Sequence, residues 1–580
     1  MHDLVIRGGS LVDGTGAPPR TADVAVDDGV ITAVGHLSDP GAKRTLDADG
    51  LIVMPGVVDI HTHYDGQATW DPVLTPSSWH GVTTVVMGNC GVGFAPVRPG
   101  SEDWLIQLME GVEDIPGTAL SEGISWGWET FPEYLDAVEG MARSVDVAAQ
   151  VPHGAVRAYV MGERGARNEP ASPEDIAAMA AMVRDGIAAG ALGFSTSRTI
   201  MHRAVDGEPV PGTFAAEDEL FGIGQALGDL GAGVFELAPA GVMGEDLSAP
   251  RREVEWMRRL SAAIHRPVTF ALSQHNRVPD QWRELLRFAE EANADGADLR
   301  PQVAGRPLNM LAGFQTFHPF RGRPSYAAVA DLPLAQRIEH LRNPEVRRAI
   351  LAEPSPADPL LALINTGLGH MFPMGEPPDY EPTPEMSVEA IARREGRPAD
   401  EVLYDLMLGH GGRELLMFTL LGYANGNLDD MREMLLHPSS ALGLSDGGAH
   451  CGVICDASIP TFMLTHWARD RSDGLPLELV VRKMTLDTAQ LYGFGDRGVV
   501  APGYRADLNL VDWEGLRLRL PELVFDLPGG ARRLVQQAEG WRSTIVAGEE
   551  TRADGEDTGA RPGRLVRGAR PGPGASAAHG

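Results

Sequence analysis

The segment GVVDIHTHYDG, residues 56–66, places two histidines directly after a short apolar run. His61 and His63 are two residues apart, so on a β-strand their side chains point to the same face. Imidazole is a good ligand for zinc and related divalent metals. Such a pair also arises by chance in a chain with 17 histidines among 580 residues, so the rest of the sequence must decide its meaning.

Strand-like and helix-like segments alternate after this pair. The clearest helix begins after Ser172, a good N-cap, with Pro173 at the first helical position, and ends at Gly190. Short runs rich in β-branched or apolar residues predict strands. Besides residues 56–63, we expect strands at residues 81–89, 156–162, 191–197, 231–238, 266–273, 297–304 and 440–448. About eight βα units predict an α/β fold with a (β/α)8 TIM barrel over residues 55–496.

The two ends of the chain are rich in short strands and turns. Residues 1–54 include a hairpin signal at Asp27-Asp28-Gly29, and residues 497–552 have a similar texture. We expect the two ends to pair into one small β-sandwich; two unrelated β-rich patches are the alternative. Residues 306–438, rich in proline and glycine, are expected to form an insertion that is part of a lid. Residues 553–580 lack apolar periodicity and are expected to be a disordered tail or a crossing arm.

Composition excludes several classes of partner. The chain carries 80 acidic and 49 basic residues, a net charge of −31, which argues against a nucleic-acid partner. No apolar run reaches the roughly 20 residues of a membrane span, and the N-terminus has no secretory signal pattern. Three cysteines do not make a disulfide framework. We therefore expect a cytoplasmic protein without a membrane partner; a homo-oligomer is compatible with this sequence.

Two further residues are expected beside the histidines. Asp446, in LGLSDGGAH, ends the last predicted strand, which barrel closure brings next to the first. Cys90, in VVMGNCG, ends the second strand, and a thiolate is a strong zinc ligand. A turn aspartate and a buried unligated thiol are the alternatives, and the neighbouring histidines favour a site for Asp446.

These motifs, with DLVIRGGSLVDGTG near the start and GYRADLNLVD at residues 503–512, resemble the amidohydrolase superfamily. The similarity points to its N-acyl-D-amino-acid deacylase (D-aminoacylase) branch and is specific over residues 1–100 and 440–515. It implies a metal-bearing TIM barrel, a β-sandwich from both chain ends, and hydrolysis of amide C–N bonds outside peptides. By position, it implies His61, His63 and Cys90 as metal ligands, and Asp446 as a ligand and general base.

The chain departs from the family on the fifth and sixth strands. Where the family places a histidine, strand five offers only Glu236, and strand six has Leu272 with His275 just beyond. Either Glu236 and His275 complete a second metal site, or that site is lost. A carboxylated lysine cannot bridge two metals here, because Lys43 and Lys483 lie outside the barrel strands. We expect one divalent ion, zinc, rather than two.

The expected function is metal-dependent hydrolysis of an N-acyl amino acid, with preference for the D configuration. Asp446 would take the proton of the attacking water and return it to the leaving nitrogen. The resemblance implies cationic groups for the substrate carboxylate, and Arg198, His202 and Arg306 are the candidates. Two alternatives stay open: a cyclic amide or imide hydrolase of the hydantoinase or dihydropyrimidinase type, and a non-catalytic binding protein that has lost its metal.

Overall fold

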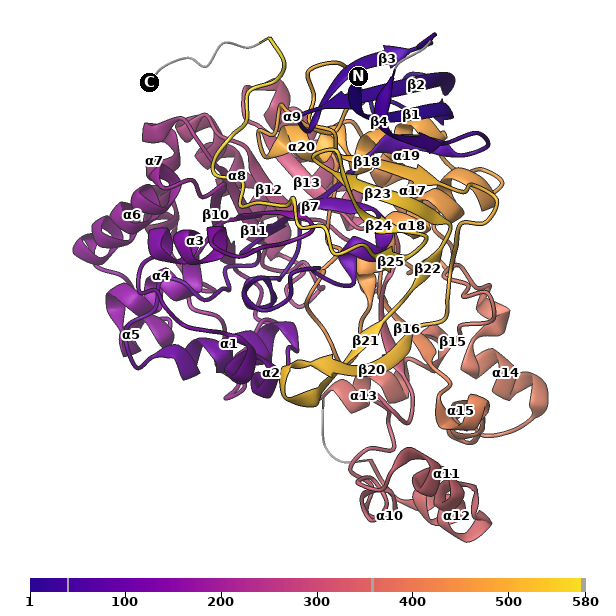
Figure 1. The fold of residues 1–580 in the computed structure, drawn as a ribbon. Coiled ribbons are helices and arrows are strands. Elements are labelled where there is room, and N and C mark those ends of the chain that lie inside the picture. The colour runs from indigo at the N-terminus through magenta and orange to yellow at the C-terminus, as the bar shows by residue number, and fades with distance from the viewer. Residues whose placement is uncertain (39–40, 356–358, 575–580) are drawn as a thin grey trace.

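A parallel barrel forms the centre of the computed structural model, which describes residues 1–38, 41–355 and 359–574 (Figure 1). All neighbouring barrel strands run parallel. The strands, with the third interrupted into two pieces, are β6 (Val57–Asp59), β7 (Val82–Met87), β8 (Asp146–Ala149) with β9 (Val151–Pro152), β10 (Gly193–Ser197), β11 (Val234–Ala238), β12 (Val268–Ala271), β13 (Leu299–Val303) and β17 (Ala441–Leu442). The prediction of a TIM barrel with an additional β-rich domain is confirmed.

Barrel closure depends on the segments that follow β17 and β6. The Asp446 N–H donates to the His61 carbonyl at 3.1 Å, and the His63 N–H donates to the Gly447 carbonyl at 2.8 Å. Thr62 and Gly447 form a parallel bridge. Closure therefore places Asp446 beside the two histidines at the carboxyl ends of the strands, where barrel enzymes carry their active sites.

The prediction for strand three was wrong. Residues 156–162 lie mostly in α4 (His153–Met161), and the strand is the earlier DVAAQVP segment that forms β8 and β9. A short apolar run suits a buried strand and a buried helix equally well, so its pattern could not separate the two. Gln150 separates the two pieces, β8 pairing with β7 and β9 with β10.

Helices surround the barrel, and α6 begins as predicted. The Ser172 side chain accepts from the Asp175 N–H and the Asp175 side chain accepts from the Ser172 N–H, which forms a capping box. Within the described part of the chain, no helix is both long and apolar enough to cross a membrane. The helices are α1 (Glu102–Glu113), α2 (Gly117–Gly123), α3 (Phe131–Glu139), α4, α5 (Glu163–Ala166), α6 (Pro173–Ala188), α7 (Glu217–Leu230), α8 (Ala249–Ile264), α9 (Gln281–Ala294), α17 (Asp429–Leu436), α18 (Ile459–Phe462), α19 (Leu477–Met484) and α20 (Leu486–Leu491).

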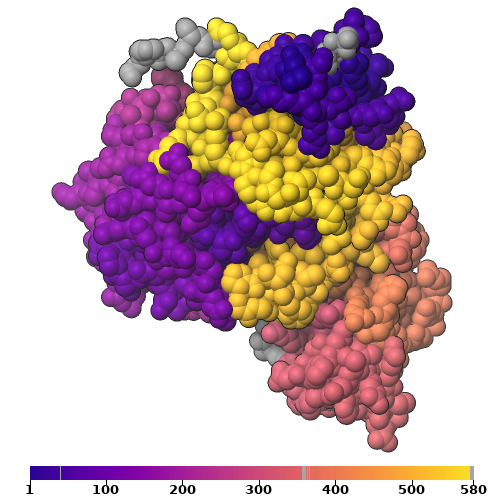
Figure 2. Space-filling view, viewed as in Figure 1, coloured from indigo at the N-terminus to yellow at the C-terminus, as the bar shows by residue number. Residues whose placement is uncertain are grey.

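The two chain ends share one sheet. Figure 2 shows the N-terminal strands against the C-terminal segment, and β18 pairs with β5 and β23. The expected hairpin forms, with Asp28 and Gly29 as its left-handed turn residues. The strands of this nine-stranded sheet are β1 (His2–Leu11), β2 (Arg20–Asp27), β3 (Val30–Gly35), β4 (Ala42–Asp47), β5 (Ile52–Pro55), β18 (Leu508–Val511), β23 (Trp541–Val546), β24 (Glu549–Ala553) and β25 (Glu556–Asp557).

The segment between β13 and α17 forms a subdomain with its own hydrophobic core, which includes Phe314, Tyr404 and Phe418. Its helices α10–α12 project away from the barrel in Figure 1. Its elements are β14 (Leu308–Ala312), α10 (Pro324–Ala327), α11 (Leu334–Arg342), α12 (Pro344–Ala352), α13 (Pro359–Thr366), β15 (Met371–Pro373), α14 (Val388–Glu395), α15 (Ala399–Met407), α16 (Gly409–Gly412) and β16 (Leu416–Leu421).

The C-terminal segment is an arm rather than a disordered tail as far as residue 574. Leu565 and Val566 are buried, and the Val566 N–H donates to the Val147 carbonyl on β8 at 2.7 Å. Arg567 pairs with Asp136 on α3. The low apolar content of this segment suggested disorder, but two apolar residues and backbone hydrogen bonds attach it to the barrel. Residues 575–580, also expected to be disordered, lie outside the described residues.

Candidate metal centre

Four of the predicted site residues meet at the carboxyl ends of β6, β7 and β17. His61 and His63 follow β6, Cys90 follows β7, and Asp446 follows β17. Ligand atoms of His61, His63 and Cys90 lie within 4.8 Å of one another, and all three residues are buried. The buried strand VVMGNCG and barrel closure therefore bring together residues that are up to 385 positions apart in the sequence.

The spacing of the donor atoms fits one metal ion. His61 Nε2 lies 3.5 Å from Cys90 Sγ and 3.3 Å from Asp446 Oδ1, and His63 Nε2 lies 3.6 Å from the same Asp446 oxygen. Tetrahedral zinc, with bonds of roughly 2.0–2.3 Å, requires ligand–ligand separations of roughly 3.3–3.8 Å. Two imidazoles, a thiol and a carboxylate are also donor types that zinc accepts.

Neighbouring side chains orient the two histidines. His61 Nδ1 lies 2.9 Å from the Gln302 side-chain oxygen on β13, so Nδ1 carries the proton and Nε2 keeps its lone pair for a ligand. His63 Nδ1 lies 3.4 Å from a carboxylate oxygen of Glu113, at the end of α1. Such partners behind metal-binding histidines fix the ring and its tautomer.

Two of the four residues adopt backbone conformations that are rare for residues other than glycine. Cys90 has φ +55° and Asp446 has φ +48°. A Cβ at Gly91, which follows Cys90, would come within 2.8 Å of the Ser197 backbone nitrogen on β10. Residues held in such conformations cluster at functional sites, where the surrounding structure maintains them. The glycines beside Cys90 and Asp446 thus allow both side chains to reach the centre.

Burial and nearby charges perturb the acid–base behaviour of the group. Burial lowers the pKa of His61 to about 4. Burial also disfavours the charged form of His63, but the carboxylates of Glu113 and Asp446 outweigh it and raise the pKa of His63 to about 9. Burial alone would raise the pKa of Asp446. The hydrogen bond from His63 and the charges of the nearby histidines outweigh burial and hold this pKa well below its ordinary value. Asp446 is therefore an ionised carboxylate at neutral pH.

Glu236 and His275, the predicted substitutes for the missing histidines, lie in different places. Glu236 is beside the centre: its Oε2 accepts from the Cys90 N–H at 3.0 Å, and burial raises its pKa to about 8. His275 is not at the centre. Its Nδ1 accepts from the Val278 N–H, and its Nε2 lies 3.0 Å from the Gln281 side-chain oxygen. Both ring nitrogens of His275 have partners away from the centre, Val278 in its loop and Gln281 at the start of α9, so the structure does not bring His275 to the other candidate ligands.

A cavity of about 380 Å³ opens above the centre. Of the three candidates for carboxylate binding, His202 lines it, and burial lowers the pKa of His202 to about 3. Arg198 does not line the cavity; it pairs with Glu253 at 2.8 Å. Arg306 lines the cavity but is 1% exposed, because it pairs with Asp456 at 2.8 Å. Both arginines are thus held in ion pairs with carboxylates of the protein.

Three residues at the site were not predicted from the sequence. Glu113 and Gln302 contact the histidines from behind, and His450 lines the cavity with its Nε2 3.9 Å from Asp446. His450 is four residues after Asp446 in SDGGAH, which is a signal that could have identified it. Gln302 lies on a strand, and its neighbours gave no sign of chemistry. Glu113 ends a helix that carries no motif.

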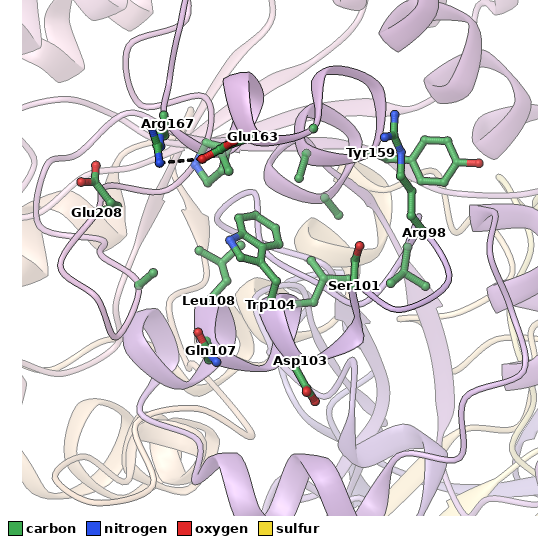
Figure 3. Close-up of a pocket in the computed structure, with 18 of the residues that line it drawn as sticks. Arg98, Ser101, Asp103, Trp104, Gln107, Leu108, Tyr159, Glu163, Arg167 and Glu208 are labelled. Carbon is green, nitrogen blue, oxygen red and sulfur yellow. Dashed lines mark ion pairs between the residues drawn. The ribbon is translucent and has the colours of Figure 1, made fainter.

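A second cavity, of about 910 Å³, lies between α1 and α4–α5 (Figure 3). Its labelled residues include Trp104 and Tyr159, and an exposed ion pair joins Arg167 to Glu163 at 2.6 Å. None of the predicted site residues lines it. Although this cavity is larger, the smaller one holds the side chains that could bind a metal ion, and it is the candidate functional site.

Comparison with known sequences shows the family of the chain. Residues 44–551 match the model of the Amidohydrolase family. The D-aminoacylase of Alcaligenes xylosoxydans xylosoxydans is 28% identical over 570 residues, covering 97% of each chain. The N-acyl-D-glutamate deacylase of the same organism is 36% identical over 347 residues, covering 57% of this chain and 64% of that protein.

Solved structures show the same relationship. A crystal structure of D-aminoacylase is 26% identical, with a TM-score of 0.65 over 98% of this chain and 100% of that one. Another D-aminoacylase structure is 26% identical, with a TM-score of 0.64 and the same coverage. That protein has a binuclear metal centre, with one-metal activation and second-metal attenuation. The chain therefore belongs to the amidohydrolase family and is a hydrolase of carbon–nitrogen bonds other than peptide bonds.

Proposed function

We propose that the protein hydrolyses N-acyl amino acids, with preference for the D configuration, and uses one divalent metal ion. The observation that carries the proposal is the convergence of His61, His63, Cys90 and Asp446 beneath a cavity at the carboxyl ends of the barrel strands. The similarity to proteins named D-aminoacylase and N-acyl-D-glutamate deacylase supports the substrate class.

The four converging side chains would hold the ion, and zinc suits them best. Leu272, which follows β12, offers no ligand for a second ion. Glu236 uses its Oε2 to accept from the Cys90 N–H. A bound divalent ion supplies Lewis acidity toward a carbonyl oxygen and lowers the pKa of a water.

Asp446 performs the proton transfers in this proposal. Its ionised carboxylate faces the cavity and accepts a proton from the water that attacks the amide carbonyl. The same carboxyl group then gives the proton to the leaving nitrogen. Water adds across the C–N bond, which yields the carboxylate of the acyl group and a free amine. His61 and His63 stay fixed by Gln302 and Glu113 during these steps.

The test is a hydrolysis assay with the zinc-loaded protein and N-acyl derivatives of D- and L-amino acids. We expect the D-substrates to be cleaved, and Asp446→Asn to lower kcat by at least about 100-fold. Asp473→Asn, an exposed aspartate on another loop, is the matched control and should keep full activity. Full activity of Asp446→Asn, or no cleavage of any amide by the wild-type protein, contradicts the proposal.

A further inference from the structure

The cavity above the metal-binding residues is enclosed mainly by apolar side chains from separate elements. Leu272 follows β12, Met310 lies on β14, Leu421 on β16 and Met434 on α17, and all four line the cavity. Each is less than 10% exposed. These side chains offer hydrophobic contact and no hydrogen bonds, so the part of a ligand that fills this space must be apolar.

No arginine or lysine side chain of this cavity is free to bind a substrate carboxylate. Among the residues that line it, all within the described part of the chain, Arg306 is the only arginine or lysine. Its guanidinium donates to Asp456, to the Cys455 carbonyl at 2.8 Å and to the Gln536 side chain at 3.1 Å, and it stacks on Tyr380. Every side of the group is occupied.

Several other polar side chains of the wall already contact protein groups, and the Ser273 hydroxyl, which also lines the cavity, is an uncharged donor. His202 Nδ1 contacts the Ser197 hydroxyl at 3.0 Å. His450 Nε2 lies 3.7 Å from Glu113 and 3.9 Å from Asp446, so its ring faces two carboxylates of the protein. The Gln274 amide donates to Asp430 and accepts from the Ala424 N–H. Carboxylate recognition usually relies on arginine forks or similar donors, and a carboxylate buried without such a partner is disfavoured.

We infer that the substrates are N-acyl amino acids with apolar acyl and side chains, and that a free carboxylate contributes nothing to their binding, so neutral derivatives are also cleaved. This inference rests on the proposed amide hydrolysis and narrows its substrate class. The carboxylate of an acidic side chain, as in an N-acyl-D-glutamate, would meet mainly apolar side chains and no free arginine or lysine. Each methylene that the cavity buries should raise kcat/KM about fourfold until the cavity is full.

The experiment compares four amides with the zinc-loaded, full-length protein: N-octanoyl-D-leucine, its N-methylamide, N-acetyl-D-leucine and N-acetyl-D-glutamate. Release of the fatty acid or acetate gives kcat/KM for each. We expect the octanoyl acid and its methylamide to differ by less than about tenfold, and both to exceed N-acetyl-D-leucine by at least about tenfold. N-acetyl-D-glutamate should be the poorest substrate.

A variant supplies the missing charge as an internal test. Met201 lines the mouth of the cavity and is 54% exposed, so Met201→Arg places a guanidinium there with little risk to folding. In Met201→Arg, the ratio of kcat/KM for the octanoyl acid to kcat/KM for its methylamide should be at least about tenfold higher than in the wild type. Met201→Gln should leave this ratio unchanged.

The outcomes separate the two claims. If methylamide formation lowers wild-type kcat/KM more than about 100-fold, or if N-acetyl-D-glutamate is the best substrate, the inference is wrong while amide hydrolysis stands. If none of the four amides is cleaved, the proposed function fails, and the inference fails with it.

Discussion

Removing the buried carboxylate of Glu219 tests whether the barrel is held together as described. Glu219 lies on α7, and its Oε1 accepts from Arg157 Nε at 2.8 Å and from His153 Nε2 at 3.0 Å. His153 Nδ1 in turn contacts the Thr196 hydroxyl on β10 at 2.8 Å. The cluster therefore joins the start of α4 to the next barrel strand and to the helix that covers it.

The pKa of Glu219 gives the size of the effect. Burial alone would raise it, but hydrogen bonds and charges from His153 and Arg157 lower the pKa from 4.5 to about 2. Since the folded-state pKa lies below the unfolded one, the ionised carboxylate stabilises the fold by about 3 kcal/mol above pH 4.5. This contribution is lost as the pH falls through 2, and about 2 kcal/mol of it remains at pH 3.5.

The assay is reversible urea unfolding of Glu219→Gln and the wild type between pH 7 and pH 3.5, followed by tryptophan fluorescence. The variant should lower the free energy of unfolding by about 3 kcal/mol at pH 7, and the difference should narrow to about 2 kcal/mol at pH 3.5. The control is Glu217→Gln on the same helix, whose exposed pair with Arg259 should contribute less than about 1 kcal/mol. Equal costs for the two variants, or a difference independent of pH, would refute the reasoning.

Three further changes test the site. Cys90→Ala should lower zinc affinity by at least about 100-fold and abolish the thiolate-to-cobalt charge-transfer band of the cobalt-substituted protein. The control Cys451→Ala should keep the band. An unchanged band in Cys90→Ala would show that Cys90 is not a metal ligand. Glu113→Gln should weaken zinc binding about 10- to 100-fold in a chelator competition, and Asp103→Asn on the same helix should not; equal affinities would show that Glu113 does not support His63. Arg306→Met should destabilise the fold by about 3–5 kcal/mol, because it leaves the buried Asp456 unpaired. Adding Asp456→Leu should recover most of this stability. A stable Arg306→Met variant with weakened substrate binding would show instead that Arg306 contacts the substrate.

The barrel could be predicted because its strands and helices are local patterns. The β-branched run of β7 is buried along its whole length, and the cap at Ser172 forms as its residue types require. The third strand could not be located, because α4 is as apolar as a strand and the true strand contains Asp146 and Gln150. These two polar residues find partners far away in the sequence: Asp146 pairs with Arg497, and the Gln150 amide nitrogen donates to Asn89.

The site residues also divide into those that local sequence patterns predict and those that depend on contacts in the folded chain. His61, His63, Cys90 and Asp446 end strands, so barrel topology alone places them together. Glu113 and Gln302 act through contacts that only the folded chain creates. Arg306 seemed free in the sequence because its partner Asp456 follows 150 residues later. A charged residue near a strand end thus identifies a candidate contact, but its partner decides whether the charge is available.

The metal content of the purified protein tests the central claim most directly. The chain should be loaded with zinc, freed of excess metal by gel filtration, and analysed for metal per chain. One buried set of His61, His63, Cys90 and Asp446 predicts about one equivalent, and Asp446→Asn with Cys90→Ala should retain almost none. Two equivalents, or less than about a tenth of one in the wild-type protein, would contradict the account.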